Sequence, residues 1–151
     1  INNIKRKGFV DILNKKAHEE KIPVLGICLG MQIMASFGFE NGKNTGLNWF
    51  DAKVVKIEPK DNKIKIPNIG WETISYNDNV LMTSLPKNPD FYFVHSYYMN
   101  CENKEDITSW YELGDMKITS SIQKENIFGT QFHPEKSSDF GREVLINFID
   151  Y

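Results

Sequence analysis

The fold is decided by the stretch Gly26-Ile27-Cys28-Leu29-Gly30-Met31-Gln32, which follows the apolar run 22–25. This pattern predicts a buried strand that turns sharply into a helix with a thiol at the corner, a cysteine version of the nucleophile elbow. Glycines two residues either side of Cys28 would remove β-carbons that collide where the chain doubles back. The amide of Leu29 should point toward the sulfur, and the helix start should favour the thiolate. Cys28 is therefore a candidate nucleophile, with a buried structural cysteine as the alternative.

A second segment, near the end of the chain, contains what a nucleophilic cysteine needs. It reads Ile127-Phe128-Gly129-Thr130-Gln131-Phe132-His133-Pro134-Glu135. We expect a short strand ending in His133 and Glu135, because Pro134 favours an extended chain and residues two apart in such a chain project to the same side. The imidazole would then serve as acid and base toward Cys28, and the carboxylate would fix its tautomer.

With both segments in view, the chain resembles the class I (triad) glutamine amidotransferases, whose glutaminase domains carry a G-x-C-x-G-x-Q elbow and a late H-P-E segment. Within that family it is most similar to glutaminases of the imidazole glycerol phosphate synthase type. The likeness is carried by four segments, 26–32, 67–71, 92–98 and 129–137. The resemblance implies an α/β fold, a three-layer open mixed sheet with helices on both faces and a nucleophile elbow.

The resemblance also implies a reaction. L-glutamine would be hydrolysed to glutamate and ammonia through a cysteine thioester without a cofactor or metal. The ammonia would pass to a synthase (cyclase) subunit that forms imidazole glycerol phosphate in histidine biosynthesis. The implied catalytic residues are Cys28, His133 and Glu135; the implied substrate-binding residues are Gln32, Leu29, Ser96 and Tyr97; and the implied partner contacts are Trp71, Tyr92 and Lys136.

Two departures from the family pattern leave the ammonia acceptor open. Histidine-biosynthesis glutaminases commonly carry His and Asn where this chain has Asn68 and Glu72, both in the turn expected to face the partner. A sugar amidotransferase of a surface-polysaccharide pathway is therefore an alternative acceptor. Alternatives from other classes are a stand-alone γ-glutamyl thiol hydrolase and a non-catalytic interaction subunit. Trp71 itself fits a core position and a partner interface about equally well.

Composition restricts the class of protein. The chain has 151 residues, a formal charge of −2 and ordinary apolar and charged fractions, which fits a single domain over residues 1–151. Its basic residues are scattered among acids, and no apolar stretch approaches the length of a membrane span, so neither nucleic-acid nor membrane binding is expected. The two cysteines are far apart, no Cys/His cluster has metal-ligand spacing, and Cys101 lies in a polar segment. These features favour a reducing compartment, the cytoplasm.

The start of the chain differs from the family. The sequence begins at Ile1 and soon enters a helical pattern, whereas domains of this family open with a strand, a helix and further strands before the elbow. We expect the N-terminal part of the domain, including the loop that supplies a second oxyanion donor, to lie outside this sequence.

Periodicity predicts the remaining elements. Helices are expected over 7–20, 31–37 and 139–149; short strands over 54–57, 63–66, 73–75 and 127–132; a central strand over 91–95; and a hairpin of 108–113 with 117–122. His95, at the end of the expected central strand, has no carboxylate near it in sequence. We therefore expect it to be a structural histidine and not the catalytic base.

Overall fold

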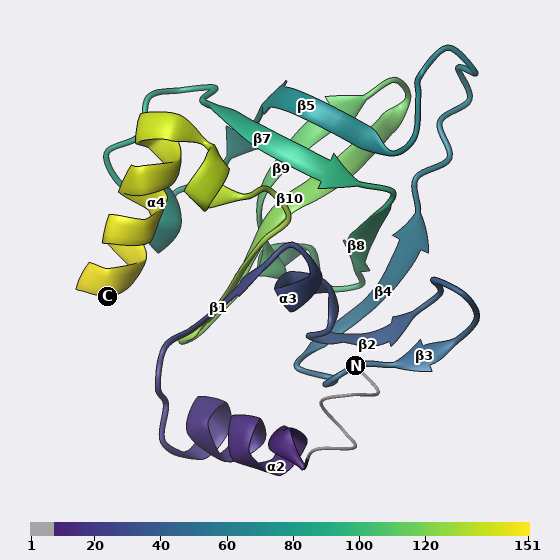
Figure 1. Ribbon diagram of the computed structural model, residues 1–151. Helices are drawn as coiled ribbons and strands as arrows, with labels where there is room; N and C mark the ends of the chain where they lie inside the picture. The colour runs from purple at the N-terminus through teal and green to yellow at the C-terminus, as the bar shows by residue number, and fades with distance from the viewer. Residues whose placement is uncertain (1–7) are drawn as a thin grey trace.

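The computed structural model describes residues 8–151, and its largest sheet has five strands (Figure 1). Their order across the sheet is β1 (Val24–Ile27), β11 (Ile127–Thr130), β10 (Met116–Lys124), β9 (Ile107–Leu113) and β6 (Ser75–Tyr76). Only β1 and β11 run parallel; the remaining pairs are antiparallel. The carboxyl ends of β1 and β11, from opposite ends of the sequence, therefore meet at one edge of the sheet.

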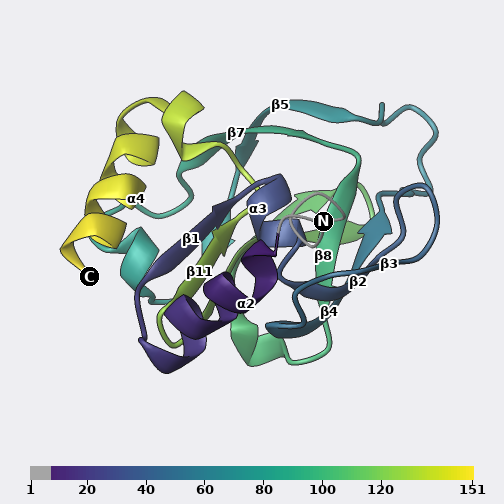
Figure 2. The ribbon, with the colours of Figure 1, turned by 60° about the horizontal axis from the view of Figure 1, so that its bottom comes forward.

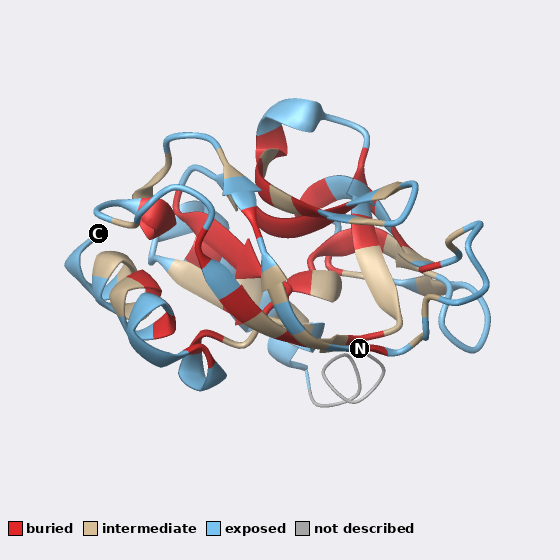
Figure 3. Cartoon of the chain, turned by 90° about the horizontal axis from the view of Figure 1, so that it is seen from above, coloured by how far each residue is buried: buried red, intermediate tan, exposed pale blue. Residues whose placement is uncertain are grey.

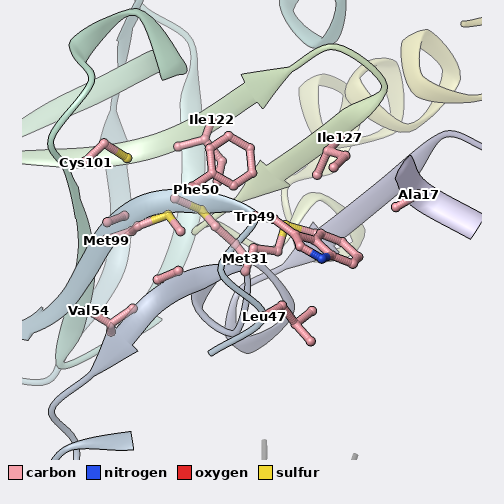
Figure 4. Packing of buried hydrophobic residues seen from close by; sticks show 13 residues of the cluster. Ala17, Met31, Leu47, Trp49, Phe50, Val54, Met99, Cys101, Ile122 and Ile127 are labelled. Carbon is pink, nitrogen blue, oxygen red and sulfur yellow. The ribbon is translucent and has the colours of Figure 1, made fainter. Parts of the chain in front are cut away.

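Alternate residues of β1 and β11 face two different hydrophobic clusters. The α2-side cluster, named for helix α2 (Phe9–Asn14), consists of buried Ala17, Met31, Met34, Ala35, Leu47, Trp49, Phe50, Ala52, Val54, Met99, Cys101, Ile122 and Ile127 (Figure 4). The α4-side cluster, named for helix α4 (Ser138–Asp150), consists of buried Ile57, Ile74, Leu81, Met82, Phe91, Phe93, Tyr111, Ile118, Phe128, Phe132 and Val144. Ile127 and Phe128 are neighbours in β11 and lie in different clusters, as the two-residue period of a strand requires.

Helices cover both faces of this sheet. On one side, Val10 and Leu13 of α2 (Phe9–Asn14), which continues as the π-helical turn η1 (Lys15–Glu19), pack against the α2-side cluster. On the other, Val144 and Phe148 of α4 (Ser138–Asp150) pack into the α4-side cluster. The two helices lie well apart in Figure 2, with β1 and β11 between them. The expected mixed sheet with helices on both faces is therefore confirmed.

Two smaller sheets complete the described chain. The four-stranded sheet has the order β3 (Asn44–Thr45), β2 (Ala35–Gly38), β4 (Phe50–Lys56) and β8 (Tyr97–Cys101). A two-stranded ribbon pairs β5 (Asn68–Thr73) with β7 (Asp90–His95). Single turns of 3₁₀-helix occur at η2 (Val80–Met82), η3 (Lys104–Asp106) and η4 (Pro134–Lys136). Figure 3 shows buried residues gathered along the strands and exposed ones in the loops and on the outer side of α4.

Three predicted elements are confirmed. Helix α2 with η1 fills the predicted helix 7–20, of which residue 7 lies outside the described residues. The hairpin of β9 and β10 turns at Gly114, whose φ of 62° is a conformation that glycine adopts without strain. Helix α4 matches the predicted C-terminal helix 139–149.

The predicted helix over 31–37 is wrong. Helix α3 spans only Leu29–Gln32, and Ala35–Gly38 is strand β2, parallel to β4. The carbonyls that would continue the helix are taken by another segment, since Leu47 donates its N–H to the Ile33 carbonyl at 2.7 Å. Tertiary pairing with 47–50 therefore overrides the local helical pattern.

The predicted strand over 63–66 is absent, and the predicted strand over 91–95 is present but is not central. Residues 63–66 form no strand, because Asp61 turns the chain there: its carboxylate accepts the Lys63 N–H at 2.9 Å, an Asx-turn. The predicted central strand 91–95 is β7, which pairs only with β5 within the described chain. Its burial alternates: Phe91, Phe93 and His95 are buried, and the residues between them are half-buried. The strand expected over 91–95 is therefore confirmed, but it is buried on one face only and does not occupy the centre of a sheet.

Candidate functional site

Cys28 occupies the corner between β1 and α3 in a backbone conformation that side chains rarely adopt. Its φ is 48° and its ψ is −105°. A β-carbon on Gly26 would lie 2.6 Å from the carbonyl carbon of Gly30, so the returning backbone requires glycine at position 26. Among residues 8–151, a β-carbon on Gly30 would meet nothing within 4 Å, so the expectation of crowding at both glycines is wrong for Gly30. The elbow itself is present, and its crowding is confined to the strand side.

The end of β11 runs directly beside the elbow. The N–H of Cys28 donates to the Thr130 carbonyl at 2.7 Å, which extends the parallel pairing of Ile27 with Thr130 by one residue. Gln131 is fully buried, and its Nε2 lies 3.5 Å from the Cys28 sulfur. Strand pairing therefore brings position 131 into contact with a thiol that is 103 residues away in sequence.

Gln32, in the same short helix as Leu29, joins this group. Its Nε2 donates to the Tyr97 carbonyl at 2.9 Å and to Oε1 of Gln131 at 2.9 Å. The carbonyl of Ser96 is occupied by the N–H of Ile57 at 2.9 Å. The structure thus brings Cys28, Gln32 and Tyr97 together around Gln131, a residue that our sequence prediction did not assign to the site.

A sequence signal for Gln131 was present. It is a long polar side chain within the predicted strand 127–132, which is otherwise made of apolar and small residues. A buried polar group needs hydrogen-bond partners, so a glutamine next to the predicted catalytic residues is expected to bond to side chains of the site. What the sequence lacked was the parallel register of β1 and β11, which identifies the partner.

His133 and Glu135 follow within four residues of Gln131. Nδ1 of His133 lies 2.7 Å from Oε1 of Glu135; the histidine side chain is 18% exposed and the glutamate side chain 48%. The predicted extended segment is wrong, because Pro134 begins the 3₁₀ turn η4. A proline's fixed φ and missing N–H suit the first helical position, and the turn brings the carboxylate back to the imidazole. Phe132 anchors this end by stacking on Phe91, with ring centroids 4.1 Å apart.

Burial is the main influence on the thiol. It raises the pKa of Cys28 above the ordinary value, and the nearby Glu135 carboxylate acts in the same direction. The Leu29 N–H opposes this, as do the Gln131 amide and the Lys136 ammonium. The expected amide of Leu29 thus acts on the sulfur, but the expected preference for thiolate is wrong because desolvation outweighs it. A neutral thiol at this position needs a base when it reacts.

His95 has a different environment from His133. Its Nδ1 lies 2.8 Å from the Tyr97 carbonyl and its Nε2 lies 2.9 Å from the Tyr111 hydroxyl. Burial lowers the pKa of His95 to about 4. Both ring nitrogens are therefore engaged in a neutral imidazole, and the prediction of a structural histidine is confirmed.

The predicted partner contacts lie on the β5–β7 ribbon and beside it. Trp71 is 52% exposed and stands edge-on to Tyr92, with ring centroids 6.0 Å apart. Lys136 is exposed in η4. Asn68, expected to face a partner, is instead buried, and its Nδ2 donates to the Tyr111 hydroxyl at 3.0 Å. The residue at position 68, where this chain departs from the family pattern, therefore lies inside the protein and not on the surface expected to face the partner.

Two negative findings concern residues 8–151. That part of the chain contains no group of three or more His, Cys, Asp or Glu side chains placed to hold a metal ion. None of its helices combines the length and apolar character needed to cross a membrane.

Known proteins resemble this chain in sequence over nearly its whole length. The chain is 47% identical over 152 residues to imidazole glycerol phosphate synthase subunit HisH 2 of Methanococcus maripaludis, covering 99% of this chain and 73% of the relative. It is 44% identical to the corresponding subunit HisH of Leptospira interrogans, covering 98% of this chain and 73% of that protein.

Solved structures agree on the fold. A putative GMP synthase subunit from Thermoplasma acidophilum matches with a TM-score of 0.66 at 23% identity, covering 93% of this chain and 62% of that one. A glutamine amidotransferase from Thermotoga maritima matches with a TM-score of 0.61 at 18% identity, covering 97% of this chain and 56% of that one. The family model described as glutamine amidotransferase class-I matches residues 5–150. The chain therefore belongs to the class I glutamine amidotransferase family.

Proposed function

We propose that this chain is a glutaminase subunit that hydrolyses L-glutamine to glutamate and ammonia. The observation that carries the proposal is the contact between the strained Cys28 elbow and the end of β11, where Gln131 lies 3.5 Å from the sulfur. The same strand end continues within two residues into the His133–Glu135 pair. A nucleophile, a base and its orienting carboxylate thus come from one edge of one sheet.

The reaction follows the chemistry of these groups. The Cys28 sulfur attacks the side-chain carboxamide carbon of glutamine while His133 accepts the thiol proton. Collapse of the tetrahedral intermediate breaks the C–N bond, and His133 returns the proton to the leaving ammonia. Water then attacks the γ-glutamyl thioester with His133 again as base, which releases glutamate and restores the thiol. Glu135 holds the imidazole tautomer throughout.

Stabilisation of the developing oxyanion is assigned to the Leu29 amide. This N–H already acts on the Cys28 sulfur, so it points into the space beside the nucleophile. Oxyanion donors of this kind are worth about a hundredfold to a thousandfold each in rate. Gln32, which reaches Gln131 beside the nucleophile, is proposed to bind glutamine together with Ser96 and Tyr97. The Tyr97 carbonyl already has two partners, so its contribution is to hold Gln32 in place.

The ammonia acceptor is proposed to be a cyclase-type synthase subunit. Two observations support this: the relatives named as imidazole glycerol phosphate synthase subunits, and the exposed aromatic surface of the β5–β7 ribbon. Trp71 and Ile69, exposed to 52% and 60%, project from the edge strand β5, and Lys136 is exposed in η4, which contacts β7. A large aromatic flanked by apolar and charged neighbours is typical of an interface anchor. The reaction needs a reduced thiol, which fits the cytoplasm.

Glutamate release by the full-length protein tests the function. We expect slow release alone and strong stimulation by the cyclase-type synthase subunit with its ligand, with Cys28→Ser as the background. Stimulation by a sugar amidotransferase instead would identify the alternative acceptor. Release that no partner changes would indicate a free γ-glutamyl hydrolase, and no release under any condition would contradict the proposal.

Binding to the synthase subunit tests the surface separately. Trp71→Ala should weaken association by about 2 kcal/mol if this side chain is an interface anchor. Trp110→Ala, at a half-buried position on β9 where the Lys117 ammonium covers the ring, is the matched control. A loss of thermal stability in Trp71→Ala with unchanged association would return this residue to a packing role.

A further inference from the structure

Gln131 holds a central position in the site and has no role in the chemistry described so far. It is fully buried, and its side chain contacts both the nucleophile and Gln32. A buried amide has two donors and a carbonyl oxygen to satisfy, so its orientation decides which atom faces the sulfur. If the nitrogen faces the sulfur, the amide donates; if the oxygen does, it repels a thiolate.

The orientation of the Gln131 amide is fixed by its hydrogen-bond partners, beginning with the Tyr97 carbonyl. The Tyr97 carbonyl can only accept, so the Gln32 atom 2.9 Å from it must be the amide nitrogen. That same nitrogen lies 2.9 Å from Gln131, which must therefore present its oxygen to it. The nitrogen of Gln131 is left facing Cys28 at 3.5 Å. One backbone carbonyl thus sets the direction of every hydrogen bond in a two-glutamine relay.

His95 reinforces this direction. Its Nδ1 lies 2.8 Å from the same Tyr97 oxygen and must be the donor in that bond. Its Nε2 then accepts from the Tyr111 hydroxyl at 2.9 Å. The Tyr97 oxygen therefore accepts from two N–H donors, and a flipped Gln32 would place its own oxygen against this acceptor.

We propose that Gln131 is a positioning residue that directs an N–H at the Cys28 sulfur, with its polarity set by the Tyr97 carbonyl through Gln32. This inference rests on the proposed nucleophilic role of Cys28. The donated hydrogen bond fixes the side-chain conformation of the thiol and stabilises the negative charge that forms on sulfur when His133 takes the proton. Hydrogen bonds to charged groups are about twice as strong as neutral ones, so the effect is greatest once the charge has formed.

The test measures the thiol directly. In the full-length protein, the rate of Cys28 alkylation by iodoacetamide is followed against pH by peptide mass spectrometry, without glutamine. Gln131→Met keeps the volume and removes the donor, and we expect the alkylation profile to move up by about one pH unit, a tenfold loss of rate near neutral pH. Gln123→Met, on β10 outside the site, is the matched control and should leave the profile unchanged.

A second variant covers the case in which Gln131→Met does not fold. Gln131→Glu is nearly isosteric and replaces the donor with an acceptor, so the profile should move at least as far upward. For Gln131→Glu, whose carboxylate still accepts from Gln32, kcat for glutamine should fall about tenfold with KM nearly unchanged, because the lost contact is to the nucleophile. An unchanged alkylation profile in a folded variant would overturn the proposal and leave Gln131 as a packing residue.

The two proposals fail in distinguishable ways. If the wild-type protein releases no glutamate yet its alkylation profile moves on Gln131→Met, the positioning role stands and the glutaminase proposal falls. If glutamate is released normally and the profile does not move, the positioning role alone is wrong.

Discussion

The chain has one thiol and one imidazole at the sheet edge formed by β1 and β11, and another of each near the two ends of β8. At the sheet edge, Cys28 is half-buried and receives hydrogen bonds from its surroundings. At the far end of β8, Cys101 is buried in the α2-side cluster, and burial raises its pKa to about 12. The same functional group is thus placed once where it can react and once where it acts as a small apolar side chain.

The imidazoles differ in the same way. His95 has both ring nitrogens bound to fixed protein atoms, the Tyr97 carbonyl and the Tyr111 hydroxyl. His133 is bound through Nδ1 to a half-exposed carboxylate. A base must leave one nitrogen available for a proton, so the proposed base His133 differs from His95 in having only Nδ1 hydrogen-bonded among residues 8–151.

Exchanging the thiols one at a time should give the largest contrast. Cys28→Ser is expected to reduce glutamate release by at least about a thousandfold, because a serine hydroxyl in a site built for a thiol is a poor nucleophile. Cys101→Ser should keep release within a few-fold of wild type. Release is measured with the synthase subunit present, and binding of that subunit should be retained by both variants. Near-normal release by Cys28→Ser would remove the assigned nucleophile.

Removing the orienting carboxylate should have the next largest effect. Glu135→Gln leaves His133 without the acceptor that fixes its tautomer, and we expect glutamate release to fall by about a hundredfold to ten-thousandfold. Glu125→Gln, an exposed glutamate paired with Lys21, is the matched control. A loss under about tenfold would mean that the imidazole is positioned by something other than Glu135.

The edge that carries the proposed catalytic residues could be predicted because its motifs are local in sequence. The geometry of the elbow motif and of the H-P-E segment depends on only a few neighbouring residues in each case. The structure accordingly has a strained backbone at Cys28 and a hydrogen-bonded His133–Glu135 pair. Gln131 was missed because its role depends on the register of two distant strands. The sign of the Cys28 pKa shift was missed for a related reason, since desolvation depends on what covers the sulfur.

The four-stranded sheet was the least predictable part of the fold. Residues 33–37 lie in the predicted helix, but in the structure the N–H groups of residues 47–50 bind the carbonyls of residues 33–35, and strand β2 follows. Sequence patterns indicate the secondary structure that a segment prefers by itself, whereas the secondary structure of this segment depends on its hydrogen bonds to residues 47–50. The same holds for Gly26 and Gly30, which look equivalent in sequence and differ in what surrounds them.

The two glycines therefore offer a matched pair. Gly26→Ala would place a β-carbon 2.6 Å from the Gly30 backbone, and we expect a loss of about 3 kcal/mol in unfolding free energy. Gly30→Ala has open space and should change stability by less than about 1 kcal/mol. Denaturant unfolding of the full-length protein measures both. Equal losses would show that the crowding at the elbow is not confined to the strand side.

The buried imidazole should give the smallest and most specific effect, a pH dependence of stability. The pKa of His95 is lowered by burial from 6.5 to about 4, so the unfolded chain binds a proton over a pH range in which the folded chain does not. The stabilisation is full above the unfolded pKa and is lost as pH falls toward the folded pKa. Between about pH 6.5 and about pH 5 the loss should be about 1.5 kcal/mol. His95→Gln should remove this slope, while His18→Gln, at an exposed position, should keep it. A slope retained in His95→Gln would assign it to another group and would weaken the view that the His95 imidazole is held neutral by its two partners.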